Sequence, residues 1–353
     1  MLRDWRDTPL EALLAEHELA GVPERGFPND GWSGARLTVL EHGRRRFVLK
    51  RTSWATDWIA RATSDRQLRE GWVAANDLFP VPPVEAPYLG AAADGDALAV
   101  LMPDLSAELI AWERPSQARA FDAVQLDRVV DAIGTMHLRT WGDGIPGCPI
   151  EERVLLLSRP SAERYRAAGL PVGDRFLAGW DAFDRRASPA ARALVSDLAG
   201  DPAPLLEALA RLPAANLHGD LKLANVALVD EDRVGLIDWQ MTLRAPVAVE
   251  LGWFLVSNVG ILPERPEAIL DRYRDAVGFR GLSGVGRPNG GAGRVLGDWD
   301  AQGDLTWIVG LLLRGWRKGL DAEAGVATGW GATASDDLAW WCRRAVEASD
   351  RRL

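Results

Sequence analysis

The fold is decided by residues 216–240, which read NLHGDLKLANVALVDEDRVGLIDWQ. Two short apolar runs, 226–229 and 234–237, flank the turn Asp230-Glu231-Asp232. Apolar runs of this length on either side of a polar turn predict a β-hairpin. The two ends of a hairpin lie side by side, so the residues just outside it are expected to meet.

Three polar residues occupy those ends. Asp220 and Asn225 precede the hairpin, and Asp238 follows it directly. Magnesium prefers hard oxygen ligands, and it usually takes one or two carboxylates and leaves its other positions to water and phosphates. The sequence therefore predicts a magnesium site at Asn225 and Asp238. Asp220 would face an incoming hydroxyl and accept its proton.

The motif HGDLKLAN at 218–225, followed by IDWQ at 237–240, resembles the signature of the aminoglycoside phosphotransferase and choline kinase-like superfamily. The resemblance implies an α+β, bilobal, protein-kinase-like fold with a β-rich N-lobe (1–104) and a mainly helical C-lobe (105–353). It also implies transfer of the γ-phosphoryl group of ATP to a small-molecule hydroxyl. Protein kinases carry Arg in place of Gly219 and Phe-Gly in place of Trp239-Gln240, so a protein acceptor is disfavoured. Taken alone, the motif HGDLKLAN leaves one alternative open, namely an ordinary polar hairpin whose acidic side chains are solvated.

The N-terminal third is predicted to hold the nucleotide. A helix begins near Thr8-Pro9, and strands are expected at 36–40 and 46–50, where alternation puts Val48 and Lys50 on one face. The resemblance implies that Lys50 holds the α- and β-phosphates and that Val48 covers the adenine. It also implies a flap over the phosphates at 31–34, with Ser33 and Gly34 as donors. A strand-end lysine that reaches into water is the alternative for Lys50.

Two further segments complete this nucleotide site. The capping pattern Ser64-Asp65-Arg66-Gln67 predicts a helix that runs to about residue 78. A buried lysine needs a carboxylate partner, and the resemblance implies Glu70, with Asp65 as the competitor. Residues 97–105 read as a buried strand that leads into a turn, and the resemblance implies that this turn is the hinge, where Met102 or Leu105 would donate to the adenine because Pro103 has no N–H.

The C-lobe prediction concerns the catalytic loop and its supports. Lys222 would neutralise charge at the γ-phosphate, or else face solvent. The resemblance implies that His218 is a structural anchor and that an acid near Glu250 braces the loop; glutamate is one methylene longer than the usual aspartate, which leaves that brace open. Helical periodicity puts His137 in a core. The glycine-rich segment 278–297 reads as a loop.

The composition of the chain limits which classes of partner it could bind and in which compartment it is expected. The net charge of −9 argues against a nucleic acid or an anionic membrane, and the acidic N-terminus is unlike a signal peptide. We expect a cytoplasmic protein with both cysteines reduced. Acids and aromatics in the C-lobe suit an aminoglycoside, an amino sugar or sugar, or a choline-like alcohol, although a packed core explains the same residues. A catalytically silent nucleotide-binding regulator is the alternative function; it usually lacks the strand lysine, loop aspartate or metal aspartate, all of which are present here.

Overall fold

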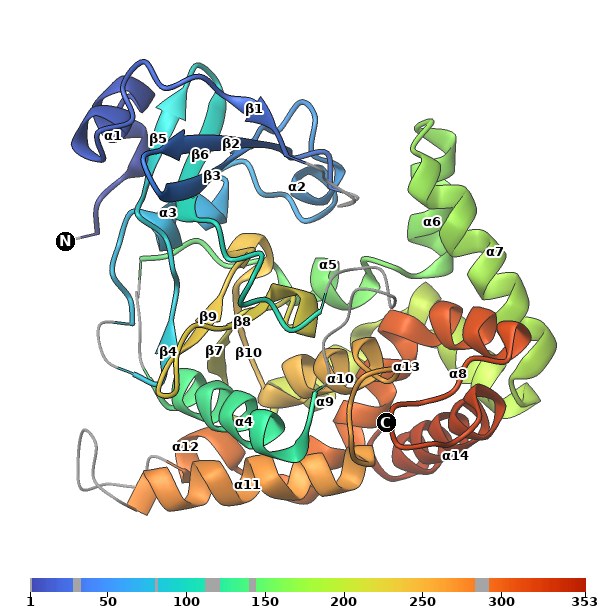
Figure 1. Cartoon of the computed structure of the whole chain (residues 1–353). Coiled ribbons are helices and arrows are strands. Elements are labelled where there is room, and N and C mark those ends of the chain that lie inside the picture. Colours follow the sequence, from blue (N-terminus) through green and yellow to red (C-terminus); the bar gives the residue numbers. More distant parts are fainter. Residues whose placement is uncertain (1, 28–32, 80–81, 112–120, 140–143, 283–291) are drawn as a thin grey trace. The chain divides into compact units, whose positions relative to one another are not determined.

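The protein is described from a computed structural model that places residues 2–27, 33–79, 82–111, 121–139, 144–282 and 292–353 (Figure 1). The chain divides into two compact units. Unit 1 contains residues 1–119, 140–148 and 223–242, and unit 2 contains residues 120–139, 149–222 and 243–353. Unit 1 carries most of the strands and unit 2 is mainly helical, which confirms the α+β class. The predicted lobes are the continuous ranges 1–104 and 105–353, whereas each compact unit combines several separate segments. The lobe boundary at residue 104 therefore stays a prediction.

Unit 1 is built on a five-stranded antiparallel sheet with the order β1-β2-β3-β6-β5. Its strands are β1 (Arg25–Gly26), β2 (Arg36–His42), β3 (Arg45–Thr52), β6 (Ala97–Pro103) and β5 (Gly90–Asp94). The predicted hairpin of β2 and β3 is confirmed, with Gly43 at a positive φ of 63° in its turn. The predicted strand at 97–105 is confirmed as β6.

Both faces of this sheet are covered. Residues of β3 alternate between two apolar clusters, with Val48 in one and Leu49 in the other. Helix α1 (Leu10–Glu16) contributes Leu10 and Leu13 to the Leu49 cluster. Helices α2 (Trp58–Ala62) and α3 (Arg69–Ala74) contribute to the Val48 cluster. Alternation therefore directs Lys50 toward α3, because it shares a face with Val48.

Helix α3 is shorter than the sequence predicts. It begins at Arg69, because Ser64 and Leu68 both adopt left-handed backbone conformations with φ of 49° and 52°. The carboxylate of Asp65 still caps the helix, since both of its oxygens accept a hydrogen bond from the Arg69 N–H at 3.0 Å. The predicted start at Ser64 and the predicted end near residue 78 are therefore wrong.

A second, three-stranded sheet in unit 1 contains the predicted hairpin. β8 (Val226–Leu228) pairs antiparallel with β9 (Val234–Leu236), which pairs parallel with β4 (Val84–Glu85). Short 3₁₀ turns occur at Leu223–Asn225, Trp239–Met241 and Trp5–Asp7. The predicted hairpin is confirmed, and its open end carries Asn225 and Asp238.

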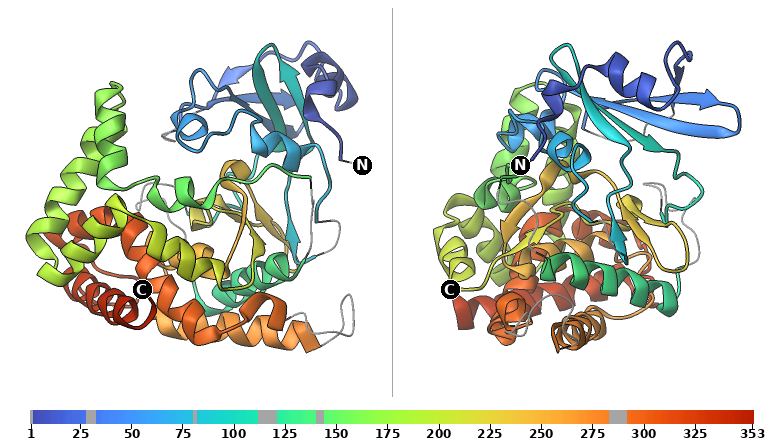
Figure 2. Two further views of the ribbon diagram at one scale, coloured as in Figure 1. Left: turned by 180° about the vertical axis from the view of Figure 1, so that it is seen from behind. Right: turned by 90° about the vertical axis from the view of Figure 1, so that its left-hand side faces the viewer.

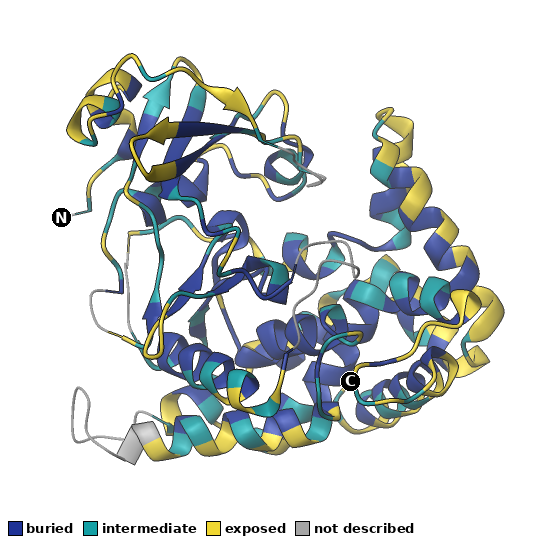
Figure 3. Ribbon diagram, viewed as in Figure 1, coloured by how far each residue is buried: buried dark blue, intermediate teal, exposed yellow. Residues whose placement is uncertain are grey.

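Unit 2 is organised around the long helix α13 (Trp299–Ala324), which packs against α7 (Pro171–Arg186), α10 (Val247–Ser257) and α14 (Ala334–Arg352) (Figure 2). Figure 3 shows that α10 is almost wholly buried. The other elements are α4 (Ala123–Leu138), α5 (Ile150–Leu155), α6 (Arg159–Ala167), α7 (Pro171–Arg186), α8 (Pro189–Gly200), α9 (Ala203–Ala210), β7 (Ala215–Leu217), β10 (Leu243–Ala245), α10 (Val247–Ser257), α11 (Pro266–Leu282), α12 (Gly293–Leu296) and α14 (Ala334–Arg352).

Glycines allow α10 and α13 to cross closely. A Cβ at Gly252 on α10 would lie 2.7 Å from the Thr306 carbonyl oxygen on α13, and a Cβ at Gly310 on α13 would lie 3.1 Å from the Gly252 carbonyl oxygen and 2.6 Å from the ring of Trp341. Real Cβ atoms do not approach other atoms so closely, so the crossing requires residues without side chains at both positions. This crossing helps to set the position of Glu250, which lies two residues before Gly252 on α10.

Some predictions fall at the edge of the described residues. Gly31 and Trp32 of the predicted flap lie outside them, as do residues 283–291 of the predicted glycine-rich loop. The flanks of that loop belong to α11 and α12, so its predicted bounds of 278 and 297 are wrong. Within the described part of the chain, none of the helices has the length and apolar character needed to span a membrane.

Candidate active site

Unit 1 brings three of the predicted site residues into direct contact. The Nζ of Lys50 on β3 lies 2.6 Å from Glu70 Oε2 on α3 and 2.6 Å from Asp238 Oδ1 after β9. Lys50 is 8% exposed and Glu70 is 2% exposed. Glu70, and not Asp65, is therefore the helix carboxylate beside the lysine.

Burial and the neighbouring charges shift the pKa values of Lys50 and Glu70. Burial on its own would lower the pKa of Lys50, but the carboxylates of Asp238 and Glu70 overcome it and raise the pKa above its ordinary value. Burial, together with the charge of Asp238, raises the pKa of Glu70, although Lys50 opposes that shift. Lys50 is therefore a fixed cation held between two carboxylates.

Tyr88 closes this cluster into a ring of four residues. Its hydroxyl donates a hydrogen bond to Glu70 Oε1 at 2.7 Å and accepts one from the backbone N–H of Asp238 at 2.9 Å. Burial raises the pKa of Tyr88 well above 10, and the neighbouring Glu70 adds to the shift, so the hydroxyl keeps its proton. Sequence reasoning did not point to Tyr88, because no motif includes it.

Asp238 occupies an unusual backbone conformation at the open end of the hairpin. Its φ and ψ are 68° and 57°, in the left-handed region that non-glycine residues rarely adopt. The N–H of Ile237 donates to the carbonyl oxygen of Asn225 at 3.0 Å, so Asn225 lies across the ladder from the residue before Asp238. The Asp238 side chain is 32% exposed, which leaves it accessible to a ligand. Backbone strain of this kind tends to occur at functional sites.

The donor set at this end fits magnesium. Asn225 offers an amide oxygen and Asp238 a carboxylate, both hard oxygen ligands. Among the described residues, no group of three or more His, Cys, Asp or Glu side chains could hold a metal ion. A site of one carboxylate and one amide is consistent with a magnesium ion whose remaining ligands come from phosphates and water.

The loop that carries Asp220 belongs to unit 2, where Glu250 of α10 braces it. Glu250 Oε2 accepts a hydrogen bond from the His218 N–H at 2.8 Å, and Oε1 accepts one from the Gly219 N–H at 2.7 Å. His218 is fully buried, and its Nδ1 accepts a hydrogen bond from the Asp220 N–H at 3.2 Å. Glutamate thus makes the contact that the sequence left open. The predicted meeting of Asp220 with Asn225 and Asp238 stays a prediction, since these residues belong to different units.

A second layer supports Glu250. His137 on α4 places Nε2 3.2 Å from Glu250 Oε2 and Nδ1 2.7 Å from the Tyr273 hydroxyl. Burial works to raise the pKa of Glu250, but His137 and His218 outweigh it and lower the pKa below its ordinary value. His137 is buried, as the helical periodicity predicts, and it also fixes the brace of the loop.

Arg153 on α5 holds the same loop from its carbonyl side. Its Nε donates to the Gly219 carbonyl oxygen at 2.6 Å, and its guanidinium lies 4.6 Å from the ring centroid of Trp253 on α10. Gly219 itself has a φ of 84°, which favours glycine. On the same loop, Lys222 Nζ lies 3.6 Å from Asp220 Oδ2. The sequence did not point to Arg153.

The predicted adenine and flap residues are all in unit 1. Val48 and Met102 face each other across β3 and β6, and Leu105 follows β6 in an apolar cluster with Leu109. In the flap, the Ser33 carbonyl accepts from the Trp58 N–H at 3.0 Å, and a Cβ at Gly34 would lie 2.4 Å from the Thr56 carbonyl oxygen. This end of the flap therefore packs on the N-terminus of α2. The nucleotide roles of these residues stay predictions.

Gln240 links the second motif to α2. Its Nε2 donates to Asp57 Oδ1 at 2.9 Å, and the same oxygen accepts the Ala60 N–H at 2.8 Å. The segment after Asp238 is thereby fixed to the helix on which the flap rests.

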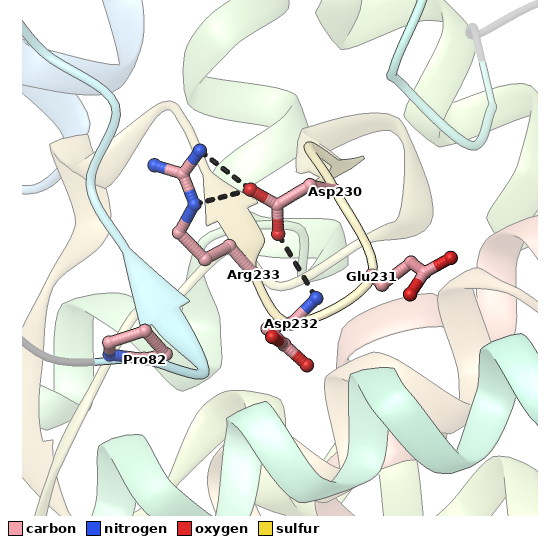
Figure 4. A pocket seen from close by; sticks show the side chains of 5 residues that line it. All are labelled: Pro82, Asp230, Glu231, Asp232 and Arg233. Carbon is pink, nitrogen blue, oxygen red and sulfur yellow. Dashed lines mark hydrogen bonds and ion pairs between the residues drawn. The ribbon is translucent and has the colours of Figure 1, made fainter.

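A hollow at the opposite end of the hairpin is lined by Pro82 and residues 230–233 (Figure 4). Arg233 in this hollow is paired with Asp230 at 2.6 Å and with Glu85 at 2.9 Å. The turn lies beyond the far ends of β8 and β9 from Asn225 and Asp238, so this hollow is not part of the candidate active site.

Asp304, Trp307 and Trp316 of α13 are engaged in contacts within unit 2. Asp304 is paired with Arg351 and Arg352 of α14. Trp307 packs edge-to-face against Trp341, and Trp316 is 1% exposed. Packing and ion pairing therefore account for these residues, which the sequence also left open as contacts for a cationic acceptor.

A family model described as the phosphotransferase enzyme family matches residues 26–286, which is most of the chain and includes both motifs. The chain belongs to the phosphotransferase enzyme family. The resemblance seen in HGDLKLAN and IDWQ is thus confirmed, and with it the expectation of a small-molecule kinase with a kinase-like α+β fold. No protein of curated function matches the sequence significantly.

Solved structures are similar to this phosphotransferase family member at low identity. A choline kinase from Streptococcus pneumoniae is 9% identical with a TM-score of 0.46, covering 95% of this chain and 98% of its own. An ethanolamine kinase from Plasmodium vivax is 10% identical with a TM-score of 0.44, covering 95% and 83%. A spectinomycin phosphotransferase, in complex with ADP and spectinomycin, is 12% identical with a TM-score of 0.40, covering 94% and 89%.

Proposed function

We propose that this protein moves the γ-phosphoryl group of ATP to a hydroxyl group of a small molecule in the cytoplasm. The observation that carries the proposal is the contact of Lys50 with both Glu70 and Asp238, in a chain of the phosphotransferase family. The acceptor is an aminoglycoside, an amino sugar or sugar, or a choline-like alcohol. A cytoplasmic location follows from the use of ATP.

Each residue has a role in nucleotide binding. Lys50 holds the α- and β-phosphates, and Glu70 keeps the lysine charged and aimed. Val48 covers the adenine, while a backbone N–H of Met102 or Leu105 donates to its edge. Ser33 and Gly34 approach the phosphates from the flap. Asn225 and Asp238 would hold magnesium, which neutralises the charge of the phosphates when it is bound.

Transfer itself is mostly a matter of positioning. The acceptor oxygen forms a bond to the γ-phosphorus, the bond from that phosphorus to the bridging oxygen breaks, and ADP leaves. The carboxylate of Asp220 orients the acceptor hydroxyl and takes its proton, and Lys222 reduces the negative charge at the γ-phosphate. Glu250 and Arg153 keep the Asp220 loop in place.

The test is magnesium-dependent release of ADP from ATP with pooled acceptors: aminoglycosides, hexoses and hexosamines, and choline with ethanolamine. We expect one pool to raise ADP release above the acceptor-free rate. Asp220→Asn should abolish this increase and keep nucleotide binding, whereas Asp232→Asn, on the exposed turn of the hairpin, should behave as the wild type. Substantial turnover in Asp220→Asn would remove Asp220 from its role. If the protein binds nucleotide but no pool raises ADP release, the alternative function of a catalytically silent nucleotide-binding regulator is favoured instead.

A further inference from the structure

Tyr88 connects the two carboxylates that surround Lys50. It lies on the connection between β4 and β5, and its ring packs against the apolar cluster that includes Val48 and Met102. Its hydroxyl contacts Glu70 Oε1 and the Asp238 N–H, while Lys50 Nζ contacts Glu70 Oε2 and Asp238 Oδ1. The four residues thus form a closed ring of polar contacts from four separate segments of unit 1.

We infer that Tyr88 is a positioning residue that fixes Glu70 and Asp238 relative to each other for binding of a magnesium–nucleotide. The inference rests on the proposed function. Without the hydroxyl, Glu70 Oε1 loses its donor and can rotate away from Lys50. The Asp238 N–H loses its acceptor at the same time, at a residue whose left-handed backbone depends on its surroundings.

Two features separate this role from simple packing. The aromatic ring alone fills the space in the apolar cluster, so Phe at position 88 preserves the packing and removes only the hydroxyl. Asp238 is the carboxylate proposed to hold the metal, whereas Glu70 acts through Lys50. Loss of the hydroxyl should therefore weaken nucleotide binding more in the presence of magnesium than in its absence.

The experiment compares Tyr88→Phe with Tyr165→Phe, since Tyr165 also loses a buried hydroxyl, which donates to the Leu156 carbonyl oxygen in unit 2. A fluorescent ATP analogue is titrated with magnesium and with EDTA, and the melting temperature of each variant is recorded. We expect Kd with magnesium to rise roughly tenfold in Tyr88→Phe, the scale of one lost hydrogen bond to a charged group. The rise in EDTA should be smaller, and Tyr165→Phe should match the wild type.

Several outcomes would overturn the inference. An unchanged Kd in Tyr88→Phe does so, whatever its turnover, and so does an equal rise with magnesium and with EDTA. An equal rise in both variants would show a general loss of stability instead of positioning. A wild type that binds no nucleotide would refute the proposed function itself, and the role of Tyr88 would fall with it.

Discussion

Arg153 donates a hydrogen bond from Nε to the carbonyl oxygen of Gly219, the residue directly before Asp220. Glu250 accepts a hydrogen bond from the N–H of the same glycine, so both the N–H and the carbonyl oxygen of Gly219 are held by side chains. An arginine on one helix and a glutamate on another therefore determine where the Asp220 carboxylate points.

Replacing Arg153 by lysine should slow transfer and leave nucleotide binding unchanged. Lysine keeps the charge but cannot place a donor where Nε lies, so the loop shifts, and misplacement of a catalytic group by about 1 Å lowers rates roughly a hundredfold. The checks are kcat with the identified acceptor and Kd for ATP. Arg166→Lys, at an exposed site on α6, is the control. A kcat within twofold of the wild type would contradict the role of Arg153.

Replacing Glu250 by glutamine should destabilise unit 2. Both carboxylate oxygens accept backbone N–H groups, and an amide would put a donor against one of them, at a loss of about 2 kcal/mol in the free energy of unfolding. The folded pKa of Glu250 is lowered, so its stabilisation is present above the unfolded value and is lost as the pH falls through the folded value.

Urea unfolding between pH 3 and pH 7 tests the Glu250 prediction. The wild type should lose more stability than Glu250→Gln on acidification. Glu267→Gln, at a partly exposed site on α11, should track the wild type. Parallel curves for Glu250→Gln and the wild type would refute the ionic role of this carboxylate.

Asp65 should give unit 1 the opposite pH dependence. Burial raises its pKa from 3.8 to about 6 despite Arg69 nearby, so the folded protein binds this proton more tightly than the unfolded chain. The resulting stabilisation is complete below the unfolded pKa and is lost as the pH rises through about 6. A shift of this size corresponds to about 2–3 kcal/mol.

The measurement for Asp65 is the slope of unfolding free energy from pH 4 to pH 7. Asp65→Asn cannot titrate, so over this range its stability should fall less than that of the wild type; Asp232→Asn serves as the exposed control. Identical slopes for Asp65→Asn and the wild type would mean that Asp65 titrates alike in the folded and unfolded chain.

Two glycines of α13 should respond oppositely to alanine. A Cβ at Gly310 would meet the Trp341 ring and the Gly252 carbonyl oxygen, so Gly310→Ala should cost about 1–3 kcal/mol. No atom lies within 4 Å of a Cβ at Gly303 on the same helix, so Gly303→Ala should stabilise by about 0.5–1 kcal/mol. The melting temperatures of both variants, measured by thermal unfolding, test this prediction. A Gly310→Ala variant as stable as the wild type would show that the helices need not cross so closely.

Local sequence was sufficient for the elements with short-range causes. The hairpin of β8 and β9 was predicted because its apolar runs and acidic turn are contiguous. The start of α3 was not, although Ser64-Asp65-Arg66-Gln67 fits a capping box. Arg69 donates to the Thr63 and Gln240 carbonyl oxygens, and the second of these lies 171 residues away. A local pattern carries no information about such a contact.

The same distinction applies to the candidate site. The family resemblance led to Lys50 with Glu70 as its partner, and separately to Asp238 as a metal ligand, whereas the contact of Lys50 with Asp238 was not predicted. Tyr88 and Arg153 were not, since their partners are set by the packing of distant segments: Tyr88 meets Asp238 across 150 residues, and Arg153 meets Gly219 across 66. The type of a residue alone does not reveal such a partner, even for tyrosine, of which the chain has only three.

The left-handed backbone of Asp238 affects how mutations at this position should be interpreted. Alanine removes the carboxylate and also places a residue that disfavours this conformation by about 1 kcal/mol, so an alanine scan mixes two effects. Asparagine adopts the left-handed region more readily, so it removes the charge without the added backbone cost. A substitution at position 238 can therefore act in two ways, by removing the carboxylate and by destabilising the left-handed turn. The asparagine variant is the one that tests the carboxylate without the cost in the turn.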